Sequence, residues 1–268
     1  MKKPFYNYII LGIILTFGLS VSAIAEITHY KFGVFPHMSV LKILQTFQPI
    51  SENFSQQLSK PVRLSTQKNF KKFTDDVMNE KYDIAFIQPF DYEKAKQANY
   101  LPLAARDILL NTIIIVGKAS PIKSIADLEG KVIAYPSITA AVTKISKRAL
   151  KKHGVNTESI HTKNHFSCIH LVVINKADAC GTANRILTHF KNKKTKNNFK
   201  VIFRAPPLPP ALFVVHSRVV EADRKKLKQT ILSWHKSQAG LKLLKNGGLE
   251  PFINVIESDY DKLKNWKD

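Results

Sequence analysis

Hydrophobic and polar positions follow two alternating periods along the chain, which indicates strands that alternate with helices. Residues 27–34 alternate as a strand does, and residues 40–58 then place apolar side chains at helical spacing, with Pro49 expected to break or kink that helix. The next segments predict strands at 62–66 and 82–87 and helices at 70–80 and 92–98. Crossovers of this length favour parallel strands in an open α/β sheet.

Ligands of such sheets bind beyond the carboxyl ends of the strands. In this chain those ends are residues 35–37, 67–70 and 88–92. Because three separate loops should converge on one edge of the sheet, we expect the ligand site there.

The second half of the chain predicts another α/β unit. Its elements are expected as strands at 112–116, 131–135, 159–162, 177–181 and 212–215 and helices at 124–130, 137–150, 166–175, 221–234 and 240–251. One strand leads out to this unit and another leads back, and the proline-rich residues 206–210 suit a stiff crossing. The sequence therefore predicts an α/β protein of two lobes, each a mixed sheet flanked by helices. Lobe I should comprise residues 26–115 and 211–268, and lobe II residues 116–210.

The first residues are typical of a secretory signal peptide. Lys2 and Lys3 precede a short apolar run, and Ala23 and Ala25 fit a small-residue cleavage site. We expect residues 1–25 to be removed and the mature chain to be periplasmic; an uncleaved anchor is the alternative.

Charge and cysteine content narrow the partners. The formal charge of +21 favours anions, while export and the scattered lysines argue against nucleic acid. Cys168 and Cys180 are either a disulfide, which export permits, or two buried thiols. Their spacing fits no zinc site, and we expect neither a metal nor another cofactor. No nucleophile-elbow, zinc-protease or phosphate-loop motif is present, so we predict no catalytic residues and no enzyme.

The start of the helix predicted after Pro136 is the clearest candidate for a binding site. Unpaired backbone N–H groups and the helix dipole bind oxyanions there without a cationic side chain. Thr139 and Ser137 supply hydroxyls, and the small Ala140 permits close approach. The simpler interpretation is that one hydroxyl only caps the helix.

Several segments, in this order, resemble the periplasmic phosphonate/phosphite-binding proteins of ABC transporters. They are 33–36 (GVFP), 82–92 (YDIAFIQPFDY), 124–139 (SIADLEGKVIAYPSIT), 175–181 (NKADACG) after His165, and 239–252 (AGLKLLKNGGLEPF). The resemblance covers nearly all of the mature chain and implies the type II solute-binding fold. It also implies a phosphonate, phosphite or phosphate ligand and a membrane permease as partner.

The resemblance extends to individual site residues. It implies that Thr139 and the neighbouring N–H groups hold the anion, that His165 and Asp178 match the family's His and Asp, and that Tyr92 matches its aromatic residue. The chain departs from the family's pattern at Ile138, Ala140, Phe166, Phe70 and Gln88, and most of these changes remove a hydrogen-bonding group.

The remaining candidates come from the first-lobe loops. Gln88 ends an apolar strand, and His37 follows the first strand. The ordinary alternatives are a turn-capping amide for Gln88, an exposed loop for His37, a helix cap for His165, a core aromatic for Tyr92 and a structural carboxylate for Asp178.

The sequence thus predicts a monomeric periplasmic solute-binding protein that closes over a small oxyanion by hinge bending. One alternative is an extracytoplasmic sensor that presents its closed state to a membrane signalling protein. Another is a basic exported surface-binding protein without a small-molecule ligand.

Overall fold

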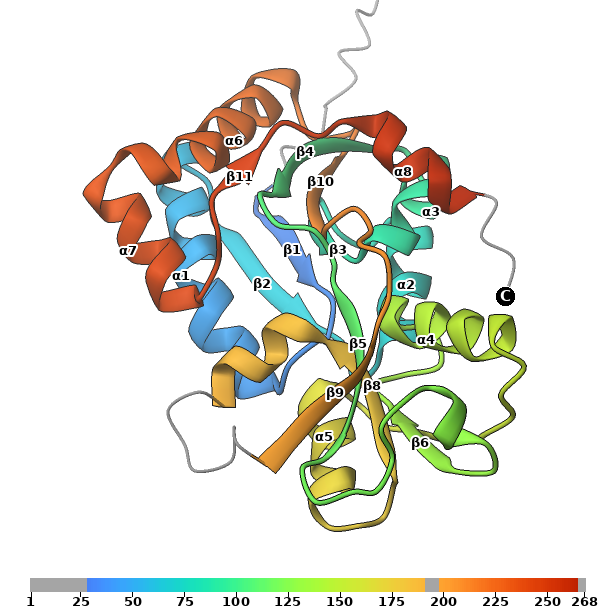
Figure 1. The fold of residues 1–268 in the computed structure, drawn as a ribbon. Helices are drawn as coiled ribbons and strands as arrows, with labels where there is room; N and C mark the ends of the chain where they lie inside the picture. The colour runs from blue at the N-terminus through green and yellow to red at the C-terminus, as the bar shows by residue number, and fades with distance from the viewer. Residues whose placement is uncertain (1–27, 191–197, 265–268) are drawn as a thin grey trace, which may run out of the picture.

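The computed structural model describes residues 28–190 and 198–264, which form two β-sheets flanked by helices (Figure 1). The predicted signal peptide, residues 1–25, lies outside the described residues. The first sheet has the strand order β11-β4-β10-β3-β1-β2. Its strands are β1 (Tyr30–Val34), β2 (Val62–Thr66), β3 (Ile84–Ile87), β4 (Tyr100–Arg106), β10 (Leu212–His216) and β11 (Phe252–Ile253). It is a mixed sheet, because β1 pairs in parallel with β2 and β3 whereas β10 runs antiparallel to β3 and β4.

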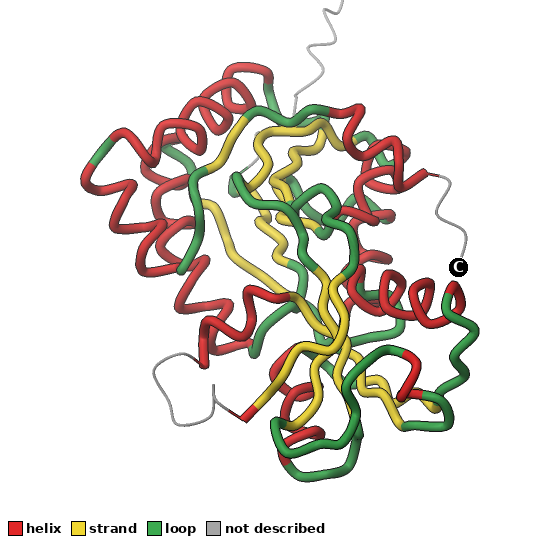
Figure 2. The backbone as a smooth tube through the Cα atoms, viewed as in Figure 1, coloured by secondary structure: helices red, strands yellow, loops and turns green. Residues whose placement is uncertain are grey.

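Helices cover both faces of the first sheet, with α1, α6 and α7 on one side and α2, α3 and α8 on the other (Figures 1 and 2). They are α1 (Val40–Leu58), α2 (Phe70–Met78), α3 (Tyr92–Gln97), α6 (Glu221–Ser233), α7 (Gln238–Gly247) and α8 (Glu257–Lys264), with 3₁₀ turns η1 (Pro89–Asp91) and η5 (Trp234–Lys236). The expected break at Pro49 does not occur, since α1 continues through it. Phe47 and Ile50, on either side of the proline, are fully buried and fix both halves of the helix to the sheet.

The second sheet has the strand order β7-β6-β8-β5-β9. Its strands are β5 (Thr112–Gly117), β6 (Val132–Tyr135), β7 (Glu158–His161), β8 (Ala179–Ala183) and β9 (Phe199–Arg204). They are accompanied by α4 (Ala141–Lys152), α5 (His165–Val173) and the 3₁₀ segments η2 (Ala126–Leu128) and η3 (Asn184–Phe190).

Side chains alternate across β5 and so separate two small cores. Ile114 and Val116 share a buried cluster with Leu150 of α4, whereas Ile113 and Ile115 share another with Ile169 of α5. The helices α4 and α5 therefore pack on opposite faces of this sheet. Cys168 of α5 and Cys180 of β8 form a disulfide, which resolves the two alternatives left open by the sequence.

Two crossings join the lobes, at residues 107–111 and 205–211, and Leu110 bridges Leu208 between them (Figure 2). The predicted boundary at 115–116 falls inside β5, which pairs with β8 and β9 of the second sheet. The first crossing therefore ends before Thr112. The other predicted boundary, at 210–211, where the chain returns to lobe I, falls within the second crossing.

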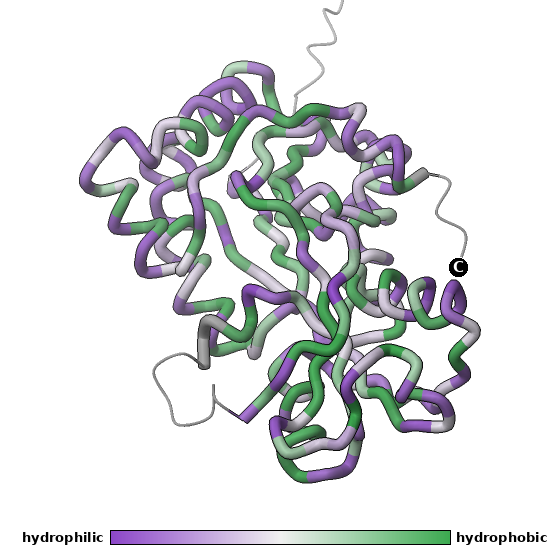
Figure 3. The backbone as a smooth tube through the Cα atoms, viewed as in Figure 1, coloured by the Kyte–Doolittle hydropathy of each residue, from purple (hydrophilic) through white to green (hydrophobic). Residues whose placement is uncertain are grey.

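Apolar residues concentrate in the strands of both sheets, while polar residues predominate on the outer helices (Figure 3). The first lobe has an aromatic core in which Phe86 and Phe213 lie 4.8 Å apart between ring centroids. Ala140 and Val142 of the second lobe join this same core, so the two lobes are in contact. The predicted two-lobed α/β architecture is confirmed. No helix within the described ranges is long and apolar enough to cross a membrane.

Candidate functional site

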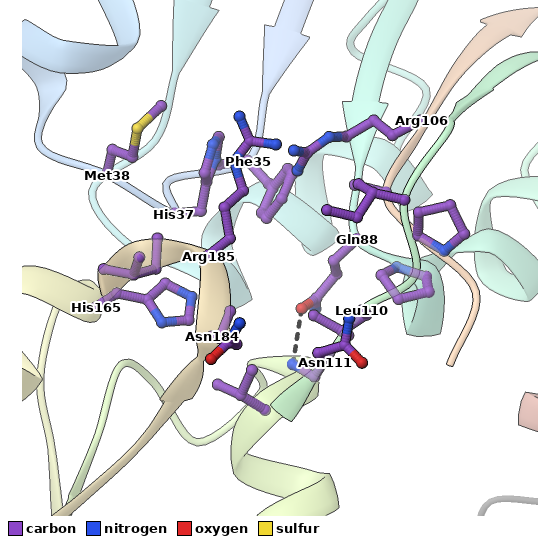
Figure 4. Close-up of a pocket in the computed structure, with 18 of the residues that line it drawn as sticks. Phe35, His37, Met38, Gln88, Arg106, Leu110, Asn111, His165, Asn184 and Arg185 are labelled. Atoms are coloured by element: carbon purple, nitrogen blue, oxygen red, sulfur yellow. Dashed lines mark hydrogen bonds between the residues drawn. The ribbon is translucent and has the colours of Figure 1, made fainter. Parts of the chain in front are cut away.

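A cavity of about 290 Å³ lies between the two lobes and the crossings (Figure 4). Each of the three first-lobe loops predicted to converge contributes to it, through Phe35 and His37, Phe70, and Gln88. Its volume lies just below the roughly 300–1,000 Å³ usual for small-molecule sites. The apolar wall includes Phe35, Met38, Phe70, Leu110, Val142 and Leu249.

The start of α4 differs from its predicted open state, because the side chain of Gln88 reaches it from the other lobe. The Ala141 N–H donates to Gln88 Oε1 at 2.9 Å, drawn as the dashed line in Figure 4, and Gln88 Nε2 donates to the Thr139 carbonyl at 3.0 Å. The N–H groups of Ala140 and Thr143 donate to backbone carbonyls. Three of the N–H groups expected to be open at this bend, those of Ala140, Ala141 and Thr143, are therefore paired in the conformation described. Gln88 supplies the oxygen that a bound anion was expected to supply.

The predicted hydroxyls lie beside this bend, outside the residues that line the cavity. Ser137 is buried, with its Oγ 3.4 Å from Thr139 Oγ1. Thr143 donates its hydroxyl to the Ser137 carbonyl, which fixes the turn. Ala140 does line the cavity, while Ile138 is 59% exposed and points away from the core.

His165 is the most buried polar candidate on the second-lobe side of the cavity. The helix α5 begins at this residue because Asn164 caps it, accepting from the Ser167 N–H. His165 Nδ1 lies 2.8 Å from Thr182 Oγ1, and burial lowers the pKa of His165 to about 4. The imidazole is therefore neutral at neutral pH and can offer a hydrogen bond but not a charge.

His37 lies across the cavity, on the first-lobe side. Its ring stacks on Phe35 at 4.3 Å between centroids, and Nδ1 lies 2.9 Å from the Phe35 carbonyl. Because a carbonyl only accepts, Nδ1 carries the proton in this contact.

Two of the predicted site residues lie elsewhere. Tyr92 is buried and packs against Tyr260 of α8, with ring centroids 4.9 Å apart. Asp178 is exposed at the start of β8 and accepts from the Val132 N–H, so it lies at the sheet edge opposite the start of α4. The structure thus brings Gln88, His37, Ala140 and His165 together around one cavity, without Tyr92 and Asp178.

Sequence reasoning missed three charged residues of the cavity. Arg106 at the end of β4 and Arg185 of η3 both pair with Glu250, which precedes β11. These three side chains are only 15% to 26% exposed. Arg185 follows the carboxyl end of β8, so applying the strand-end rule to both lobes would have identified it.

Burial lowers the pKa of Arg106 to about 10, so this guanidinium stays charged at neutral pH. Nothing in the described ranges resembles a metal centre, since no three His, Cys, Asp or Glu side chains gather there.

The comparisons with known proteins agree with this architecture. The family model of the periplasmic substrate-binding protein of phosphonate ABC transporters matches residues 32–260. The structure is similar to PhnD1 from Prochlorococcus marinus in complex with methylphosphonate, with a TM-score of 0.80 and 18% identity over 89% of this chain and 97% of that one.

Two other solved structures show the same fold. A binding protein component of a phosphonate ABC transporter from Pseudomonas aeruginosa gives a TM-score of 0.75 and 15% identity over 89% of this chain and 85% of that one. A chloride-bound protein from Xanthomonas citri gives 0.74 and 13% identity over 89% of this chain and 96% of that one. At these identities the neighbours establish the type II periplasmic binding fold.

Proposed function

The chain belongs to the family of periplasmic substrate-binding proteins of phosphonate ABC transporters, and from that membership we propose that it captures a small oxyanion of the phosphonate, phosphite or phosphate class in the interlobe cavity. Family members are transport proteins that carry a small-molecule ligand and serve a membrane permease, not enzymes. The observation that best supports the proposal is the cavity itself. Both lobes contribute basic or hydrogen-bonding side chains to it, namely His37, Gln88, Arg106, His165 and Arg185.

Hinge closure is part of this proposal. Gln88 links the lobes through Thr139 and Ala141, and the Glu250–Arg185 ion pair also crosses between them. The two crossings lie side by side at Leu110 and Leu208, which suits a hinge. A ligand that contacts both lobes favours the closed arrangement by its differential contacts.

The site residues can be ranked by their positions. His165, His37, Gln88 and Ala140 line the cavity, and we assign them to ligand contact or closure. Thr139 and Ser137 adjoin it at the capped bend and contact the ligand only if Gln88 moves away. Tyr92 and Asp178 have no position in the described cavity from which to touch a ligand.

Calorimetric titration tests the ligand class. Inorganic phosphate, phosphite, methylphosphonate and aminoethylphosphonate are titrated into the mature protein, and at least one should bind with a Kd well below about 1 mM. His165→Asn should weaken that binding about fivefold or more, because it removes the imidazole donor. His170→Asn is the matched control, since His170 lies on the same helix and is exposed. If no oxyanion of the four binds, this ligand class is wrong.

A further inference from the structure

An ion cluster of Arg106, Glu250 and Arg185 lies in the cavity, remote from the start of α4 in sequence. One carboxylate oxygen of Glu250 accepts a hydrogen bond from Arg106, and the other forms an ion pair with Arg185. Figure 4 shows the two guanidinium groups pointing toward each other beside Phe35. Two positive side chains thus share a single negative one, which leaves the cluster with one excess positive charge.

The cluster also has an unused hydrogen-bond donor. Arg106 Nε is buried and has no hydrogen-bond partner among the described residues. A buried donor without an acceptor costs about 1–3 kcal/mol, and more beside a charge. An oxyanion at this position would supply both the acceptor and the missing negative charge.

The predicted anchor at α4 offers less in the described conformation. The Ala141 N–H already donates to Gln88 Oε1, and this contact is buried. An anion binding there would have to displace Gln88 and break a contact between the lobes.

The cavity wall specifies the rest of the ligand. Phe35, Met38, Phe70, Leu110 and Leu249 line the cavity together with the arginines. A bare tetrahedral oxyanion would leave this apolar surface uncovered, whereas a carbon substituent would bury against it at about 25 cal/mol per Å².

We propose that Arg106 and Arg185 hold the anionic head of the ligand, and that the ligand is a singly charged organic oxyanion whose apolar substituent packs on this wall. This inference rests on the proposed function, because it specifies the oxyanion and its position. The single charge follows from the excess of one positive charge in the cluster.

The first experiment titrates four probes into the mature protein: inorganic phosphate, methylphosphonate, phenylphosphonate and benzenesulfonate. Benzenesulfonate keeps one negative charge at every working pH, and we expect it to bind about tenfold more tightly than inorganic phosphate. Arg185→Gln and Arg106→Gln should each weaken its binding about tenfold or more. Arg63→Gln, at an exposed position on β2, is the matched control and should change nothing.

Folding does not confound these variants, because each one leaves a single arginine paired with Glu250. Their melting temperatures should stay close to that of the wild type. The inference is overturned if both arginine variants bind the probes within threefold of the wild type. If phosphate or methylphosphonate still binds in that case, the proposed function survives alone.

If benzenesulfonate binds in an arginine-dependent way while the phosphate and phosphonates do not, the cluster is confirmed and the phosphonate class falls. If none of the four probes binds, both proposals fail.

Glu250→Gln gives a second test, in which the measured quantity is the affinity for phenylphosphonate relative to that for benzenesulfonate. Removing the carboxylate leaves two excess positive charges, so the cluster should then prefer a doubly charged head. At about pH 8.5 phenylphosphonate carries two charges, and its affinity relative to benzenesulfonate should rise about tenfold. An unchanged ratio would contradict the charge balance proposed here.

Discussion

The two lobes differ in how they are held together. The first has one aromatic core, in which Phe213 contacts Phe32, Phe54, Phe86 and Phe252 within 6 Å between ring centroids. The second divides its apolar residues between two smaller clusters on opposite faces of its sheet and adds a disulfide. The first lobe therefore depends on packing, whereas the second depends in part on a covalent link.

Phe213→Ala should lower the free energy of unfolding by about 3–5 kcal/mol, because it opens a cavity in the middle of the aromatic core. Urea unfolding monitored by circular dichroism measures the loss. Phe203→Ala, at a half-buried position on β9 of the second lobe, is the control and should cost clearly less. Equal losses at the two sites would contradict the contrast between the lobes.

Removing the disulfide should destabilise the second lobe by about 3 kcal/mol, since the bond closes a loop with a sequence separation of 12. The double variant Cys168→Ala/Cys180→Ala, followed by thermal unfolding, gives the size of the effect. A reducing agent should lower the melting temperature of the wild type but not of the double variant. If the reducing agent leaves the melting temperature of the wild type unchanged, the stability of the second lobe does not depend on the disulfide.

Asp91 in the first lobe and His165 in the second are both buried, and their contributions to stability change in opposite directions with pH. Burial raises the pKa of Asp91 to about 6, so its contribution to stability is present at low pH and is lost as pH rises from about 4 to 6. Burial lowers the pKa of His165 to about 4, so its contribution is lost as pH falls from about 6.5 to 4.

Asp91→Asn removes the opposing contribution of Asp91, so the pH dependence of stability that comes from His165 should become measurable. The variant's stability should rise by about 2–3 kcal/mol between pH 4 and 6.5, while the wild type changes less. Urea midpoints measured at four pH values provide the comparison. If the urea midpoint of the variant does not change with pH, His165 does not titrate as described.

Gln88→Ala tests the contact that joins the two lobes. It removes two hydrogen bonds to the bend before α4, so the closed state should lose about 1–2 kcal/mol and ligand should bind about 5–30-fold more weakly. Titration with whichever probe binds the wild type measures the change. Tighter binding of inorganic phosphate by the variant would show instead that Gln88 competes with the anion at the start of α4.

The fold was largely predictable from the sequence, because continuous apolar runs such as those in 112–116 and 82–87 form buried strands. Local patterns did not reveal which sheet β5 joins, since pairing with β8 and β9 depends on distant partners. The break considered at Pro49 does not occur for a related reason, because the tertiary packing of Phe47 and Ile50 outweighs the local preference of proline.

The site was less predictable than the fold. Gln88 and His37 were found because they follow strands on the expected edge, and His165 was found through the family resemblance. That Gln88 would cap the other lobe could not be read from residue types, since 53 positions separate it from Ala141. The Arg106–Glu250–Arg185 cluster combines three distant segments and leaves no local motif.

The bridge between Leu110 and Leu208 places the two ends of the second lobe next to each other. Topologically, residues 112–204 are therefore an insertion whose entry and exit share one point on the host lobe. A segment attached in this way can be exchanged as a cassette if the replacement keeps the two crossings and the contacts of Ala140 and Val142 with the first-lobe core. Chimeras that carry a relative's second lobe on this first lobe would then recombine two half-sites, and the ligand preference of each half could be read separately.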